Sequence, residues 1–244
     1  MDYFTQTVDS SLWASRAFDD EGYEGEESLG ELCGRPFELE GVKGTLDEVE
    51  SLLLCTDGAP TAFVDAVIPL SGVPGTYKSK GVDEVALRMS GNCAIIKFDK
   101  SLASERAFQL SKAIFDTLKP QKVLVLTAMP SWRAQVPDDP EVLYFLKSSS
   151  HNLSSIEPLA KGGVLPAPTL LEGMAAAVLN ECQFRAVPGC ALIGMDSSLR
   201  LSGISLARFL PAVKTLLGLD VRDNVDFAAA AEANFNPVKG NIYI

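Results

Sequence analysis

The sequence has few of the side chains that enzymes use for catalysis. It contains a single histidine, His151, and aromatic side chains make up only 8% of its 244 residues. A serine triad needs histidine as its base, and the sequence contains no G-x-S-x-G turn to present a nucleophilic serine. His151 lies in "SSSHNLSS", among residues typical of loops and helix caps. We therefore interpret it as a surface histidine and expect no catalytic residues.

The cysteines give no sign of a metal or redox site. The five of them, Cys33, Cys55, Cys93, Cys182 and Cys190, form no C-x-x-C pair. No histidine or cysteine is positioned beside the acidic turns to share a metal ion. Three of the thiols lie in apolar runs, where cysteine behaves as a small hydrophobic residue. We expect reduced structural thiols, no metal and no cofactor.

Long apolar runs are also missing. The sequence has no stretch of 18 or more apolar residues, so it predicts no membrane span. Its first residues, "MDYFTQTVDSSLW", lack the basic and apolar regions of a secretory signal, and their acidity disfavours a mitochondrial address. We expect a cytoplasmic protein, in which 47% hydrophobic residues are enough to bury a substantial core.

Basic side chains are scarce in one segment only. Residues 1–50 hold fourteen acidic and three basic side chains, which accounts for the whole formal net charge of −11. The rest of the chain is balanced, with eighteen of each sign. Nucleic-acid binding is not expected, because phosphate requires a basic face. We interpret residues 1–40 as an acidic, weakly ordered segment that solubilises the chain, with docking through Trp13 and Phe18 as the alternative.

Residues 41–236 show the hydrophobic pattern of an α/β domain. Strands are predicted at 84–89, 92–98, 122–127 and 189–195, and loops at 71–81, 129–141 and 159–168. Three helices are predicted. The first covers 104–118, the second runs from a capping box at Thr169 and Glu172 to Cys182, and the third covers 205–218 with a break at Pro211. The apolar runs 50–56, 61–69 and 142–149 fit either strand or helix. This alternation predicts a largely parallel sheet covered by helices.

The sequence ends in "VKGNIYI", an unusual combination of apolar residues with residues that break helices and strands. Ile242, Tyr243 and Ile244 follow Pro237 and Gly240, which interrupt regular structure. This ending resembles the C-terminal docking signal of proteasome activators and chaperones, which consists of a hydrophobic residue, a tyrosine and any last residue. We therefore interpret residues 237–244 as a flexible docking tail.

The C-terminal third is similar to the proteasome assembly chaperone family. The similarity is carried by "LLEGMAAAVLNECQFRAVPGCALIGMDSS" (170–198), "LSGISLARFLPAVKTL" (201–216) and the final "NIYI". It is fainter in "NCAIIKF" and "KVLVLTAMPSWRA". The order of elements fits over residues 50–244 and does not extend to residues 1–50, which leaves open whether the first strand lies at 50–56 or 61–69.

The resemblance implies a non-enzymatic chaperone for assembly of the 20S proteasome core. Such a chaperone would act as a heterodimer with proteasome assembly chaperone 2 and bind the outer face of the ring of α-type subunits. Ile242, Tyr243 and the carboxylate of Ile244 would enter a pocket between two subunits, where a lysine pairs with the carboxylate. The implied fold is a three-layer α/β/α sandwich, like that of nucleoside phosphorylases without their active site.

Two other functions remain open. A small-molecule enzyme with a nucleoside-phosphorylase-like fold would need phosphate-binding groups in its strand-end loops, for which Arg133 and His151 are the candidates. A non-enzymatic scaffold would instead pack the tail onto its own body as a strand.

Overall fold

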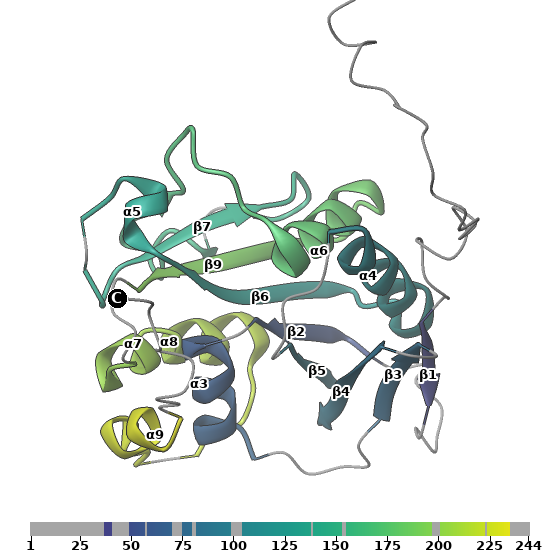
Figure 1. The fold of residues 1–244 in the computed structure, drawn as a ribbon, viewed down its shortest axis with the longest axis horizontal. Helices are drawn as coiled ribbons and strands as arrows, with labels where there is room; N and C mark the ends of the chain where they lie inside the picture. The colour runs from purple at the N-terminus through teal and green to yellow at the C-terminus, as the bar shows by residue number, and fades with distance from the viewer. Residues whose placement is uncertain are drawn as a thin grey trace, which may run out of the picture. The chain divides into compact units, whose positions relative to one another are not determined.

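A computed structural model describes residues 37–40, 49–56, 58–69, 75–79, 82–98, 104–137, 139–152, 155–196, 201–222 and 224–234. These residues build a sheet of nine strands in the order β1-β3-β4-β5-β2-β6-β9-β7-β8 (Figure 1). The strands are β1 (Glu38–Glu40), β2 (Ser51–Cys55), β3 (Gly75–Ser79), β4 (Val82–Ser90), β5 (Cys93–Lys97), β6 (Lys122–Met129), β7 (Leu143–Lys147), β8 (Gly163–Val164) and β9 (Gly189–Met195).

The centre of the sheet is parallel and its margins are mixed. Strands β5, β2, β6 and β9 run parallel to one another. On one side, β4, β3 and β1 continue the sheet antiparallel, and on the other side β7 runs antiparallel to β9 and parallel to β8. The expected largely parallel central sheet is therefore confirmed.

The central parallel strands are apolar on both of their faces. Every residue of β2, "SLLLC", is buried. Leu52 and Leu54 belong to one hydrophobic core, while Leu53 and Cys55 belong to the core on the opposite face. Such a continuous apolar run is typical of a strand covered on both sides.

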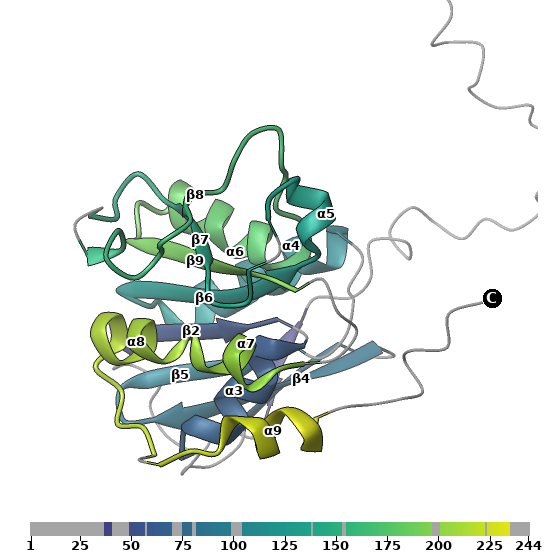
Figure 2. The ribbon, with the colours of Figure 1, turned by 90° about the vertical axis from the view of Figure 1, so that its left-hand side faces the viewer.

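Helices form a layer on each face of the sheet. The helices are α3 (Ala59–Val67), α4 (Ser104–Leu118), α5 (Ser131–Ala134), α6 (Gly173–Phe184), α7 (Gly203–Ala207), α8 (Leu210–Ala212), the π-helical turn η2 (Val213–Leu217) and α9 (Phe227–Ala233). Buried residues of α4 and α6 fill one core, and those of α3, α7, α8, η2 and α9 fill the other (Figure 2). The three-layer α/β/α sandwich is confirmed.

Several elements differ from the sequence-based expectations. Of the ambiguous runs, 50–56 contains the strand β2, 61–69 begins inside the helix α3 and extends past its end at Val67, and 142–149 contains the strand β7. The predicted loop 71–81 is wrong over residues 75–79, where β3 pairs with β4. The loop 129–141 contains the single turn α5, and the loop 159–168 contains the two-residue strand β8.

The predicted capping box at the start of α6 is wrong. The backbone amide of Thr169 donates to the carbonyl of Pro166 in a turn, and the helix begins only at Gly173. Gly173 has a φ of +64°, a conformation that glycine adopts without strain. The expected break at Pro211 is confirmed, since α7 ends at Ala207 and α8 resumes at Leu210.

Helix α4 has the bounds that the sequence predicts, but one residue faces the other way. Leu110, Ile114 and Phe115 are buried as expected. Phe108, which the helical pattern placed with them, has 49% of its surface exposed. Its position next to Ala107 lies at the margin of the apolar face, so a small rotation of the helix brings Phe108 to the surface.

The domain boundaries at residues 40 and 236 stay predictions. Most of the segment 1–40 and all of the segment 237–244 lie outside the described residues. Within the described ranges, none of the helices has the length and apolar character needed to cross a membrane.

Candidate functional site

The predicted docking residues Ile242, Tyr243 and Ile244 lie outside the described residues, so their role stays a prediction. The chain reaches them from α9. Asp226 caps this helix, because its carboxylate accepts hydrogen bonds from the amides of Ala228 and Ala229 at 3.0 and 3.1 Å. Helix α9 packs against α3 and α7. The last described helix before the predicted tail therefore belongs to the layer opposite α4 and α6.

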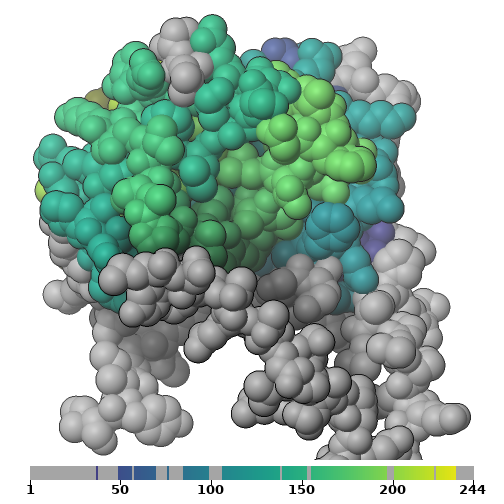
Figure 3. Space-filling model, turned by 90° about the horizontal axis from the view of Figure 1, so that it is seen from above, coloured from purple at the N-terminus to yellow at the C-terminus, as the bar shows by residue number. Residues whose placement is uncertain are grey.

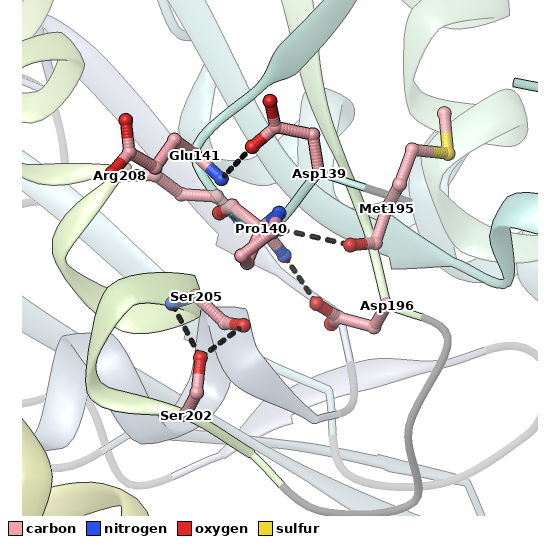
Figure 4. A network of polar contacts seen from close by, with 8 residues as sticks. All are labelled: Asp139, Pro140, Glu141, Met195, Asp196, Ser202, Ser205 and Arg208. Carbon is pink, nitrogen blue, oxygen red and sulfur yellow. Dashed lines mark hydrogen bonds and ion pairs between the residues drawn. The ribbon is translucent and has the colours of Figure 1, made fainter. Parts of the chain in front are cut away.

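The carboxyl ends of the central strands hold a buried guanidinium. In open α/β sheets, ligands bind at this edge. Nη1 of Arg208 donates to the carbonyls of Met195 at 3.1 Å and Pro140 at 3.3 Å, and Nη2 pairs with Oδ1 of Asp196 at 2.8 Å (Figure 4). Arg208 thereby joins the end of β9 to the segment that precedes β7.

Burial isolates this arginine from solvent. Only 1% of the Arg208 side chain is exposed. Burial lowers the pKa of Arg208, while the Asp196 carboxylate acts to raise that pKa, and arginine stays charged in proteins. A β-carbon on Gly194 would overlap the guanidinium, so the glycine leaves the space that Arg208 fills. A group enclosed in this way stabilises the strand ends and is not exposed to a ligand.

Neighbouring polar groups at the same end of the strands form hydrogen bonds with one another. Ser202 caps α7, because its Oγ accepts a hydrogen bond from the amide of Ser205 at 3.0 Å, and this Oγ lies 2.8 Å from Oγ of Ser205 (Figure 4). The hydroxyl of Thr56, after β2, donates to that of Thr127 on β6 at 2.8 Å. These contacts hold the loops in place at the strand ends.

The structure does not bring the two candidate phosphate-binding residues together. Arg133 lies in α5, at the carboxyl end of β6, and its Nη2 pairs with Oε1 of Glu172 at 2.7 Å. His151 follows β7, whose last residue pairs with Cys190 at the amino end of β9. Because β6 and β9 are parallel, Arg133 and His151 lie at opposite edges of the sheet. This arrangement does not form the site that a phosphorylase would need.

The cysteines in the described part of the chain are free and buried. They are Cys55, Cys93, Cys182 and Cys190. Burial raises the pKa of Cys93, Cys182 and Cys190 to about 12, and raises that of Cys55 well above its usual value. Among the described residues, no three histidine, cysteine or acidic side chains are grouped so that they could hold a metal ion.

We expect these four thiols not to react with iodoacetamide at pH 8 in the folded protein. The thiolate is the reacting species, and a pKa of about 12 leaves about one thiol in ten thousand ionised at that pH. Mass spectrometry of the alkylated peptides measures the reaction, and unfolding in guanidinium should expose all four. Rapid labelling of any of them in the folded protein would contradict the structure.

An open groove of about 650 Å³ lies along α6, on the side of the sheet that α4 and α6 cover. Its walls are Phe108 of α4, residues 146–148 at the end of β7, residues 169–173, and the outer face of α6. Figure 3 looks onto this side, with the light-green α6 beside the teal α4. Its polar lining residues include Asn180 and Gln183 of α6 and Glu172, which precedes the helix.

Large apolar side chains are exposed around this groove. Phe184, at the end of α6, is 89% exposed, and Leu170 and Phe108 are 73% and 49% exposed. Sequence reasoning missed this surface, because it counted Phe108 with the core and treated α6 only as a covering helix. The available signal was the pair of small residues Gly173 and Ala176, which lie outside the buried face of α6.

Comparison with known proteins finds similarity in the fold rather than in the sequence. Neither a family model nor a curated protein matches this sequence. Among solved structures, PbaA of Pyrococcus furiosus, an archaeal homologue of proteasome-assembly chaperone, superposes with a TM-score of 0.63 at 16% identity. That match covers 84% of this chain and 96% of PbaA.

Two further structures share the arrangement. PbaB of Pyrococcus furiosus, an archaeal proteasome activator, gives a TM-score of 0.55 at 13% identity over 82% of this chain and 94% of PbaB. A proteasome-assembly chaperone homologue of Mycobacterium tuberculosis gives 0.50 at 13% identity over 79% of this chain and 95% of that homologue. The chain therefore has the fold of the proteasome assembly chaperone homologues, as the resemblance in its sequence indicates.

Proposed function

We propose that this protein is a non-enzymatic chaperone for assembly of the 20S proteasome core. The observation that carries the proposal is the fold shared with PbaA, which extends over 84% of this chain and 96% of PbaA. The sequence resemblance over residues 50–244 supports the same assignment. The sealed guanidinium of Arg208 is consistent with it, because that group fills the strand-end position where enzymes with open α/β sheets bind ligands.

The chaperone acts as a heterodimer with proteasome assembly chaperone 2, in the place that assembly chaperone 1 occupies. The pair binds the outer face of the ring of α-type subunits in the cytoplasm. Ile242 and Tyr243 enter a pocket between two subunits, and the carboxylate of Ile244 pairs with a lysine there. This part of the proposal rests on the sequence of the tail and on the family resemblance.

The energetics of such a tail favour a supporting role. Burying Ile242 and the ring of Tyr243 contributes roughly 1.5–3 kcal/mol each, and the paired carboxylate contributes roughly 1.5–3 kcal/mol. Ordering about four backbone residues costs roughly 1–2 kcal/mol for each. The balance is small, so contacts of the folded domain or a second tail must add to the affinity through effective concentration.

Affinity purification of the tagged chain from its own cells tests the function. We expect α-type proteasome subunits and one related chaperone chain to co-purify. Quantitative mass spectrometry against a tag-only purification measures the enrichment. Recovery of the chain by itself, with no proteasome subunit enriched, would contradict the proposal.

A further inference from the structure

We propose that α9 opens from the domain as a unit, by rotation about a hinge that precedes it, while the rest of the fold stays intact. Figure 2 shows the helix, in yellow, at the margin of its layer. It has seven residues, all of them described, and Ala231 is the only one that is buried. By contrast, six of the nine residues of α3 are buried. A helix this short is not stable by itself in water, so its position depends on its contacts with α3 and α7.

The contacts that hold α9 are apolar. The half-buried ring of Phe227 stacks on Phe63 of α3, with centroids 6.4 Å apart and 11° between the planes. Ala230 and Ala231 pack in the same core. Among the described residues, no hydrogen bond or ion pair joins α9 to another element, since its polar contacts are with its own cap Asp226 and its own carbonyls. Opening therefore costs apolar burial and breaks no polar contact within the described ranges.

The chain is fixed just before α9 and bends there. The backbone amide of Arg222 donates to the carbonyl of Val67 at 2.8 Å, which holds this point of the chain at the end of α3. Asn224 is exposed and has a φ of +58°, a left-handed conformation that asparagine adopts more readily than most residues. Hinges are a few residues at the end of an element that absorb a change in backbone angle. We therefore place the hinge at Asn224 and Val225.

Gly203, at the start of α7, controls how closely α9 can approach. A β-carbon on this glycine would lie 3.0 Å from the amide nitrogen of Ala228 and 3.1 Å from the carbonyl carbon of Phe227. Helix α7 is held in the core by its fully buried Leu206. An added methyl group should therefore move α9 outward and leave α7 in place, so Gly203→Ala perturbs the seat of α9 from outside that helix.

Opening has two consequences. It uncovers the ring of Phe63, which is fully buried while α9 is closed. It also moves the attachment point of the C-terminal tail from Asn234 back to Arg222. For the flexible tail proposed above, the root-mean-square span to Ile242 then rises from about 16 Å to about 25 Å, so α9 sets how far the tail reaches. This second consequence rests on the proposed function, whereas the opening itself does not.

Hydrogen exchange of the free, full-length protein in up to about 3 M urea tests the proposal. We expect the amides of residues 230–234 to exchange at least a hundredfold faster than those of β6. Their exchange should depend little on urea, because opening of α9 exposes far less surface than unfolding of the domain. Exchange of α9 at the rate of β6, with the same urea dependence, would overturn the proposal. No proteasome is present, so the result is independent of tail docking.

Two variants distinguish opening of the whole helix from fraying in place. Gly203→Ala and Phe227→Ala should each speed exchange of the α9 amides at least tenfold, because each weakens the seat of the helix. Phe184→Ala, a change at an exposed aromatic residue of α6 in the opposite layer, is the matched control and should leave the α9 rates unchanged. Alanine is a better helix former than phenylalanine, so Phe227→Ala would not speed simple fraying. Rates in α9 that neither variant changes would overturn the proposal.

Discussion

Replacing Gly194 by alanine should lower the free energy of unfolding by about 3–5 kcal/mol, which is the loss expected when a buried ion pair is broken. The new β-carbon would overlap the guanidinium of Arg208 and displace it from its three oxygen partners. A loss of this size corresponds to a fall of roughly 6–20 °C in melting temperature for a domain of this length. Chemical denaturation measures it directly.

The double variant Gly194→Ala/Arg208→Ala distinguishes the overlap with the guanidinium from any other effect of the alanine at position 194. Arg208→Ala should itself cost about 3–5 kcal/mol, because it leaves Asp196 and two carbonyls without their partner. Once the guanidinium is absent, Gly194→Ala adds little, so the two changes should be strongly non-additive. Arg222→Ala is the matched control, since this exposed arginine makes one long hydrogen bond of 3.4 Å. Additive losses would show that Gly194 and Arg208 are not coupled.

Adding one alanine after Ile244 should weaken binding to the α-ring about as much as Tyr243→Ala. The proposed pocket recognises the terminal carboxylate, which the extension displaces at a cost of roughly 1.5–3 kcal/mol. Loss of the tyrosine ring costs a similar amount, roughly a 10- to 150-fold weaker affinity. Ile244→Ala should be mild, because the carboxylate stays in place.

The same variants distinguish a docking tail from a tail packed on its own domain. We expect the melting temperature of the free protein to stay unchanged in all three, since the proposed tail does not contribute to the core. In the scaffold alternative, Tyr243→Ala would remove buried surface and lower the melting temperature. Thermal unfolding of the purified variants decides between the two.

The sequence predicts much of the fold because its signals are local. Helix α4 has the predicted bounds, and the buried strands β6 and β9 lie where continuous apolar runs indicate them. The strand β3 was missed because Gly72, Pro74 and Gly75 suggest a loop, while its pairing with β4 comes from the tertiary structure. The start of α6 was missed because Thr169 is held in a turn.

The surface features were harder to predict, since they depend on the orientation of whole elements. The exposure of Phe108 follows from how α4 is rotated on the sheet, which periodicity gives only to within about one residue. The contact between Gly194 and Arg208 joins a strand to a later turn, and no spacing rule connects these residues. The proposed docking tail differs from these features, because its role is inferred from the sequence alone.

The most direct test of the chaperone proposal is the affinity of the purified chain, together with its partner chaperone, for isolated proteasome α-rings. Titration of a fluorescently labelled chain measures it for the wild type and for the variant extended by one alanine. We predict saturable binding of the wild type and at least a tenfold weaker affinity of the extended chain, the lower end of what a lost charge-assisted contact gives. Absence of saturable binding, or equal affinity of the two chains, would contradict the account.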